Sequence, residues 1–438
     1  PQSVTTSRRL HPMTSTPISP RFQPAASLIT HDDAIARLKA RIAPIVGYET
    51  VPLAAAAGRA LAELITAPHP VPLHTNSAVD GYAYVASEVE ADPTRHWPIA
   101  GRAAAGHPFR GERPAGHVVR ALTGAVMPAG TDTVAMQEVC TLSTDGSSVL
   151  IPKLKSGANV RKAGEDVAAG TVLFESGHVL RPQDLAALAS VGVADVPVYK
   201  PLRIAVVSSG DEIKAPGSGP ISIGEVYDAN APMLAALGGL VGATVTNLGI
   251  LADDRPLVER TLASAARDYD VVLTSGGASQ GEEDHMAASL GKLGSRHFWQ
   301  IAIKPGRPMM FGEIGNTIVV GLPGNPVAVF VCGLMYAFPM LRRLGGAAWP
   351  TTRRYRLPAA FAFEGRKVGR REFWRGILTD TSHGLAVDKF ARDGSGLISG
   401  LRIADGLIDI PEDATDIAVG DLVDFIPFTE FGIAPKNA

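Results

Sequence analysis

The chain has 438 residues, more than one hydrophobic core usually organises, so we expect several domains. Its 46% hydrophobic and 19% charged residues are typical of a soluble globular protein. A formal net charge of −2 excludes the overall basic field that marks binding to nucleic acid or to a membrane surface. Any anionic ligand must therefore be held by a local group of donors.

Two segments are similar to targeting or membrane sequences. Arg8-Arg9 has the form of a twin-arginine signal, but prolines and polar residues follow where an apolar segment should be. The uncharged stretch Ile314–Leu341 is long enough to span a bilayer, but glycines and prolines interrupt it and favour a strand, a turn and a buried helix. We predict a disordered tail at residues 1–24 and no membrane segment. The two cysteines fit neither a disulfide framework nor a metal site, which favours a cytoplasmic protein.

The first predicted helix begins at the capping sequence Thr30–Asp33 and has an apolar face. The proline-containing connector Pro68–Pro72 is predicted to be extended. From Asn76 to about residue 155, short alternating apolar runs broken by Gly, Pro and Asp indicate β structure. A second helix is predicted to start at Pro182, because proline is favoured in the first helical turn.

After Pro201, continuous apolar strands alternate with helices, a pattern that predicts a doubly wound, mostly parallel sheet. The predicted strands are 203–208, 243–248, 271–275 and 317–322, and the predicted helices lie near 231–241, 254–268 and 326–343. A strand pair, 297–303 with 308–311, is predicted before the last crossover. From about residue 349 the helix signals fade, and a small all-β domain is expected.

Four polar clusters follow strands of this sheet, at the edge where open α/β sheets bind ligands. Three of them are the turn Ser208–Glu212, the pair Asp253-Asp254 and the glycine-rich loop Ser275–Asp284; the fourth is the loop Gly321–Pro326. Glycine-rich turns before a helix expose N–H groups that hold anions, and carboxylates there indicate a cation in the same site. The clusters predict a phosphate-bearing substrate with a divalent metal. For the Asp253-Asp254 pair alone, simple capping of the next helix is an equally good interpretation.

The turn Lys304–Arg307 supplies cations to the same domain. Pro305 and Gly306 hold it tight, so a lysine point charge and a planar arginine fork project from a fixed frame. Taken alone, such a turn is more often a solvated hairpin, and only its neighbours favour anion binding. The residues predicted to contact the anion lie in this turn or in the strand-end loops: Ser209, Gly210, Asp211, Ser275, Gly276, Gly277, Ser279, Gly281, Lys304, Arg307, Pro323, Gly324, Asn325 and Pro326.

Together these segments resemble the molybdopterin molybdenumtransferase family, which includes the E domain of gephyrin. The matches run in family order from Asn76 to Pro326 and continue weakly to Ser395. The matching segments are Asn76–Ala83, Thr123–Ala125, Val160–Asp166, Ser208–Glu212, Val226–Asn230, Asn247–Asp254, Ser275–Asp284, Ile303–Pro308 and Gly321–Pro326.

The resemblance implies an α/β protein of four domains. These are a helical, elongated linker domain (residues 25–75 plus 157–200), a β-rich insertion domain (76–156), the doubly wound molybdopterin-binding domain (201–348) and a C-terminal β-barrel domain (349–438). It also implies a reaction in which adenylated molybdopterin and molybdate give molybdenum cofactor and AMP, with Mg²⁺.

The family's functional residues can be carried over to matching positions. The functional polar residues implied are Asp80, Thr123, Glu212, Asp253 and Asp284, of which Glu212, Asp253 and Asp284 are the implied metal ligands. The implied anion and pterin contacts are Lys304, Arg307, Arg375 and Ser395. The resemblance further implies a homodimer whose active sites are shared between chains, and it leaves open a contact with the molybdopterin adenylyltransferase that makes the substrate.

Three departures and two rival functions stay open at this point. Arg307 stands where the family usually has Lys, Gln280 replaces an apolar residue and His285 replaces a Tyr, which leaves open a divergent paralogue, including one for tungstate. The adenylyltransferase shares the doubly wound domain, but the insertion with Asp80 and Thr123 and the C-terminal barrel argue against it. A non-enzymatic scaffold, as in gephyrin's second role, is less favoured because every candidate acidic position is intact.

Overall fold

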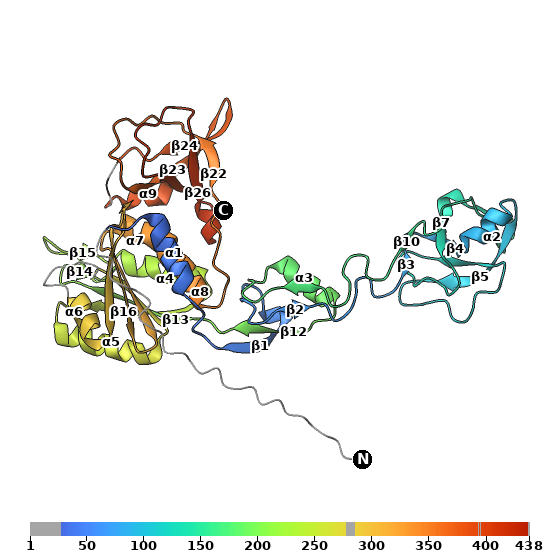
Figure 1. Cartoon of the computed structure of the whole chain (residues 1–438), viewed down its shortest axis with the longest axis horizontal. Coiled ribbons are helices and arrows are strands. Elements are labelled where there is room, and N and C mark those ends of the chain that lie inside the picture. Colours follow the sequence, from blue (N-terminus) through green and yellow to red (C-terminus); the bar gives the residue numbers. More distant parts are fainter. Residues whose placement is uncertain (1–27, 277–284, 393, 395, 437–438) are drawn as a thin grey trace, which may run out of the picture. The chain divides into compact units, whose positions relative to one another are not determined.

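The structure is a computed structural model that describes residues 28–276, 285–392, 394 and 396–436 (Figure 1). Within these residues the chain divides into two compact units. The core unit combines the chain up to Glu49 with the chain from Tyr199 onward, and the inserted unit comprises Thr50–Val198. The protein thus has the multidomain α/β organisation that the sequence predicted. The predicted tail, residues 1–24, lies outside the described residues.

A six-stranded sheet forms the centre of the core unit. In spatial order its strands are β16 (Thr244–Leu251), β13 (Arg203–Ser209), β17 (Val271–Ser275), β21 (Thr317–Leu322), β20 (Pro308–Ile314) and β18 (Ser295–Gln300). The first four strands are parallel to one another, and only β20 is antiparallel to its neighbours. Each of the four predicted parallel strands is present, and β16 continues beyond its predicted end.

Helices cover both faces of this sheet, because its central strands are apolar on both sides. Ile204 and Val206 of β13 pack into one core, whereas Ala205 and Val207 pack into the other, as the two-residue period of a strand requires. The first core is shared by α1 (His31–Arg41), α4 (Asn230–Leu240), α7 (Pro326–Cys332) and α8 (Phe338–Leu344). The second is shared by α5 (Arg255–Asp268) and α6 (His285–Leu293).

The apolar stretch before residue 345 is a helix of this core. It consists of α7, a π-helical segment Gly333–Ala337 and α8. Among the described residues, Pro326–Leu344 is the one helix long and apolar enough to cross a bilayer, and 83% of its apolar window is buried inside the structure. The predicted strand, turn and buried helix are therefore confirmed.

One predicted strand pairing is wrong at its end. β18 and β20 pair as expected, but Ile303 is not part of β18; it belongs to β19 (Ile303–Lys304), which pairs with β23 (Arg371–Thr381) of the C-terminal sheet. Ile301 and Ile303 are both buried in the same apolar core. Hydrophobicity therefore continues through the junction and does not reveal where the chain changes sheets.

The C-terminal part of the core unit is a second six-stranded sheet. Its strands in order are β19, β23, β25 (Gly406–Ile410), β26 (Leu422–Pro427) and β22 (Tyr355–Pro358), with β24 (Gly384–Lys389) also paired to β23. A bridge between Ala359 and Val387 joins the chain after β22 to β24, so the sheet curls back on itself. A short helix, α9 (Ile398–Ile403), precedes β25. Because β19 pairs with β23, this sheet is hydrogen-bonded directly to the turn that starts at Lys304.

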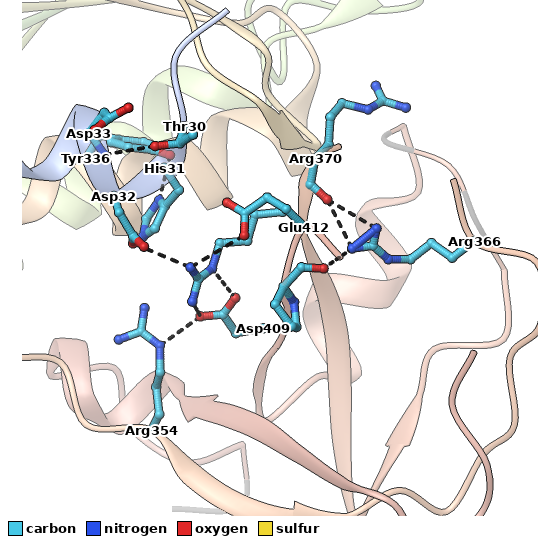
Figure 2. A network of polar contacts seen from close by, with 12 residues as sticks. Thr30, His31, Asp32, Asp33, Tyr336, Arg354, Arg366, Arg370, Asp409 and Glu412 are labelled. Atoms are coloured by element: carbon cyan, nitrogen blue, oxygen red, sulfur yellow. Dashed lines mark hydrogen bonds and ion pairs between the residues drawn. The ribbon is translucent and has the colours of Figure 1, made fainter. Parts of the chain in front are cut away.

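A buried polar network ties α1 to the C-terminal sheet (Figure 2). His31 Nδ1 lies 2.8 Å from the Tyr336 hydroxyl, and Arg371 contacts Asp32 at 3.4 Å and Asp409 at 2.6 Å. Asp409 is 1% exposed, so its negative charge is stabilised inside the protein by the ion pairs with Arg371 and Arg354. Burial lowers the pKa of His31 to about 4, and the positive charge of Arg371 acts in the same direction.

The inserted unit has its own sheet and several small hydrophobic clusters. The sheet order is β7 (Thr133–Met136), β4 (Gly81–Tyr84), β6 (Val118–Ala121), β5 (His96–Ala103), β9 (Ser148–Leu150) and β8 (Thr141–Leu142), and α2 is Ala86–Ala91. The remaining part contains α3 (Pro182–Ser190), which begins at the predicted proline. Three two-stranded pairs accompany it: β1 (Tyr48–Pro52) with β12 (Asp195–Tyr199), β2 (Ile65–Thr66) with β11 (Val172–Phe174), and β3 (Asn76–Ser77) with β10 (Val160–Arg161).

Candidate active site

The first two predicted loops lie against each other at the carboxyl ends of β13 and β16. The Gly210 N–H donates to the Leu251 carbonyl (3.2 Å), and the Asp253 N–H donates to Asp211 Oδ1 (3.0 Å). Parallel neighbouring strands end at one edge of a sheet, so residues far apart in sequence meet there. The structure thus brings the Ser209–Glu212 turn and Asp253 together, as predicted.

The two acidic residues after β16 have different roles. Asp254 is the N-cap of α5, and its side chain accepts from the Leu257 N–H at 3.3 Å. The Asp253 side chain is exposed and makes no hydrogen bond to the part of the chain that the structure describes. The capping interpretation holds for Asp254, whereas the Asp253 carboxylate stays available for a ligand.

Gly210 allows the Glu212 carboxylate to fold back over the turn. Gly210 has φ of 141°, and a Cβ at this position would meet both carboxylate oxygens of Glu212. Glycine is favoured at such a φ, and the missing side chain leaves room for the carboxylate. Glu212 is exposed, directly before the short pair β14 (Ile213–Lys214) and β15 (Val226–Tyr227).

Asn230 connects the third and fourth loops, although the sequence analysis did not select it as a site residue. Its buried side-chain amide donates to Ser275 Oγ and to the Gly324 carbonyl, both at 2.7 Å. Its N–H is held in turn by Asp228 Oδ1 at 3.0 Å. The available signal was the polar pair Asp228 and Asn230 before an otherwise apolar helix, within a segment that matches the family.

Gly276 completes the contact between these loops. Its N–H donates to the Leu322 carbonyl at 3.2 Å, and Gly324 lies against its Cα. Five predicted site residues lie outside the described residues: Gly277, Ser279, Gly281, Asp284 and Ser395. Among the described residues, no group of three or more His, Cys, Asp or Glu residues is placed to hold a metal ion.

A cavity of about 410 Å³ lies between the Lys304 turn and the C-terminal sheet within the core unit. Its lining combines basic and aromatic side chains with the strand-end loop: Lys304, Pro305, Gly306, Arg307, Pro308, Pro323, Asn325, Val327, Ala328, Phe373, Trp374, Arg375, Lys389, Phe390 and Gly394. Pro323 and Asn325 belong both to this cavity and to the loop after β21. The predicted cations and the predicted strand-end loop therefore share one site.

The cations of this cavity are held in different ways. Lys304 Nζ lies 3.3 Å from Glu372 Oε2, and the same buried oxygen accepts the Trp374 indole N–H at 2.8 Å. Because β19 pairs Lys304 with Glu372 in register, the backbone fixes this contact. Arg307 is exposed, and its guanidinium makes no hydrogen bond or ion pair with the described residues. Gly306 is required beside it, since a Cβ there would clash with Cys332 Sγ.

Arg375 reaches the cavity from β23 in a rigid setting. Its guanidinium donates to the Leu397 carbonyl (2.8 Å) and the Arg392 carbonyl (3.0 Å) and lies over the Phe390 ring at 4.6 Å. The sequence analysis missed the aromatic residues and Lys389 of this cavity. Lys389 Nζ lies 5.2 Å from the centre of the Trp374 ring. The folding of β24 against β23 brings Lys389 and Phe390 to Arg375.

Asp80 and Thr123 form a polar pair in the inserted unit. Asp80 Oδ1 accepts hydrogen bonds from the Thr123 N–H and hydroxyl, both at 2.7 Å. These bonds, the backbone one first, lower the pKa of Asp80, and Arg120 and Arg102 act in the same direction. Asp80 precedes β4 and Thr123 follows β6, so the antiparallel pairing of these strands explains their contact.

Comparison with known proteins identifies the family. Three family models match in order: "MoeA N-terminal region (domain I and II)" over residues 29–192, "Probable molybdopterin binding domain" over 205–343 and "MoeA C-terminal region (domain IV)" over 356–428. Molybdopterin molybdenumtransferase of Haemophilus influenzae is 36% identical over 403 residues, which cover 92% of this chain and 99% of the relative. The chain belongs to the molybdopterin molybdenumtransferase family.

Two further comparisons agree with this assignment. Molybdopterin molybdenumtransferase 2 of Mycobacterium tuberculosis is 32% identical over 413 residues, covering 90% of this chain and 97% of the relative. The solved structure of the molybdopterin biosynthesis moeA protein of Pyrococcus horikoshii has a TM-score of 0.77 and 27% identity, covering 92% of this chain and 100% of that one. The resemblance to molybdopterin molybdenumtransferases drawn from the sequence motifs is confirmed.

Proposed function

We propose that this protein is a molybdopterin molybdenumtransferase that inserts molybdate into adenylated molybdopterin and releases AMP. The observation that carries the proposal is the cavity lined by Lys304, Arg307 and Arg375, which shares Asn325 and Pro323 with the strand-end loops. A cationic cavity suits an oxyanion, and the adjoining carboxylate and glycine loops suit a phosphoanhydride with its metal.

The strand-end carboxylates fit Mg²⁺ as a resident cofactor. Glu212 and Asp253 offer exposed carboxylate oxygens on adjoining loops, and Mg²⁺ typically binds one or two carboxylates together with substrate phosphates. In this proposal Glu212, Asp253 and Asp284 hold the ion. When bound, it neutralises charge on the phosphoanhydride as AMP leaves.

The chain's own donors complete the site. Lys304 and Arg307 bind the oxyanion or phosphate, and Arg375, whose guanidinium is oriented by two carbonyls, lines the same cavity. Ser395 is proposed as a further contact.

We further propose a two-fold homodimer with shared active sites. The acidic residues implied by the family fall in two compact units, Asp80 in the inserted unit and Glu212 and Asp253 in the core unit. In this proposal Asp80 and Thr123 of one chain complete the site formed by Asp284 of its partner. A cytoplasmic location and a contact with the adenylyltransferase that supplies the substrate belong to the same proposal.

The proposed function is tested by measuring AMP release from adenylated molybdopterin with and without molybdate. A molybdenumtransferase releases AMP and forms molybdenum cofactor when molybdate is present. An adenylyltransferase would instead make the adenylated substrate from ATP, and a scaffold would do neither. Absence of AMP release with both substrates and Mg²⁺ present would overturn the proposal.

A further inference from the structure

Two arginines occupy the same register on neighbouring strands of the inserted unit. Arg102 near the end of β5 and Arg120 near the end of β6 are direct partners in a parallel pair. Paired residues of neighbouring strands leave the sheet on one face, with backbones about 4.8 Å apart. Both side chains are exposed. The fold therefore presents two guanidinium groups side by side.

Neither positive charge is neutralised by an acidic hydrogen-bond partner in the described parts of the chain. Arg120 donates to the neutral Gln137 Oε1 at 3.5 Å, and the guanidinium of Arg102 makes no hydrogen bond there. Like charges directly opposite each other on a sheet are destabilising. The nearby Asp80 carboxylate offsets part of this repulsion, and an anion bound between the two groups would offset more of it.

The arginine pair adjoins Asp80 and Thr123. Thr123 is the second residue after β6, and Arg120 is paired across the sheet with Tyr82, the second residue after Asp80. The positive charges of both arginines help to lower the pKa of Asp80. Asp80 Oδ1 accepts the two hydrogen bonds from Thr123, and neither arginine is hydrogen-bonded to Asp80 in the described part of the chain.

We propose that Arg102 and Arg120 bind the phosphoanhydride of the adenylated substrate. The inference rests on the proposed function, in which Asp80 and Thr123 belong to the active site. A phosphoanhydride carries charged oxygens on two neighbouring phosphorus atoms, and two adjacent planar guanidinium forks match this spacing. Molybdate is a single small tetrahedral dianion, and in the proposed function the cations of the cavity at Lys304 bind it. In this proposal the arginine pair therefore selects adenylated molybdopterin over molybdate.

The experiment uses the full-length chain with Arg102→Ala, Arg120→Ala and the double variant. Binding of ADP, the phosphoanhydride probe, is measured by isothermal titration calorimetry without molybdate. We expect the double variant to bind ADP at least about tenfold more weakly, the loss expected for removing charge-assisted hydrogen bonds. The exposed Arg110→Ala on the same unit is the matched control and should bind ADP as wild type does. Arg102→Lys with Arg120→Lys should restore part of the affinity.

Steady-state AMP release gives the second readout. The KM for adenylated molybdopterin should rise about tenfold or more in the double variant, while the KM for molybdate stays unchanged. The melting temperature should stay close to that of wild type, because both side chains are exposed and their mutual repulsion is lost together with their attraction to Asp80. A lower melting temperature with proportionate loss of all activity indicates a structural role and overturns the proposal.

Two results separate this inference from the proposed function. Wild-type protein that binds ADP through the arginines but releases no AMP contradicts the proposed function and leaves the anion site standing. Wild-type protein that releases AMP but fails to bind ADP, or binds it equally well without the arginines, overturns the anion site alone.

Discussion

The strand-end loops and the cationic cavity are built in different ways. Asp211 meets Asp253, and Gly276 meets Leu322, because parallel strands of one sheet end at the same edge. Lys304 and Arg375 meet because β19 leaves the central region and pairs with β23 in another sheet. The loops therefore depend on one sheet, whereas the cavity depends on how two sheets are joined. Damage to that junction should affect oxyanion binding more than metal binding.

The largest expected effect distinguishes Asp253 from Asp254, the two acidic residues that follow β16. Asp253→Ala should lower the rate of AMP release by about 100-fold or more, because a metal-holding carboxylate is lost. Asp254→Ala is the matched control: it should cost about 1 kcal/mol of stability by removing the α5 cap while keeping the rate. Rates at saturating substrate and thermal melts check both. Equal losses of rate in the two variants would contradict the assignment.

The junction between the sheets should weaken in acid. His31 has a folded pKa of about 4, below the ordinary histidine value of 6.5, so the folded protein binds fewer protons than the unfolded chain between these values. Its contribution is complete above pH 6.5 and is lost as the pH falls toward 4, by up to about 3 kcal/mol. Urea unfolding at several pH values measures this loss. His31→Gln, which cannot titrate, should flatten the decline, and an unchanged slope would contradict the role of His31.

Mixing inactive variants tests whether the inserted unit serves the partner chain. Asp80→Asn and Asp284→Ala should each be inactive, and after subunit exchange each mixed dimer should contain one intact site. Random exchange then recovers roughly a quarter of wild-type AMP release, as two-fold symmetry requires. Mass spectrometry of differently tagged chains verifies the exchange. No recovery despite verified exchange would falsify the shared site.

The smallest expected effect lies in the cavity. Arg307→Ala should raise the molybdate or substrate concentration required for half-maximal rate by about tenfold, because a charged hydrogen-bond donor is removed. Arg307→Lys should have a milder effect, since it keeps the charge and loses the planar fork. Kinetics at limiting molybdate and at limiting substrate check both. Unchanged kinetics for the Ala variant would mean that the turn is only a hairpin.

Local chemistry allowed much of the fold to be predicted from the sequence. The Thr30 cap and Pro182 mark the starts of α1 and α3, because capping and the fixed φ of proline act within one helical turn. The strands of the central sheet are continuous apolar runs because both of their faces are buried. The family and the order of its motifs also follow from local segments.

Only the tertiary structure decided how distant segments share a site. It assigned capping to Asp254 and left Asp253 exposed, a distinction that two adjacent aspartates do not carry in their sequence. It placed Ile303 beside β23. The sequence could not decide this, because burial of Ile303 is compatible with either sheet. It added Asn230 and Glu372, whose partners lie far along the chain. Sequence by itself determines which chemistry is present, whereas long-range strand pairing determines which groups can act on the same ligand.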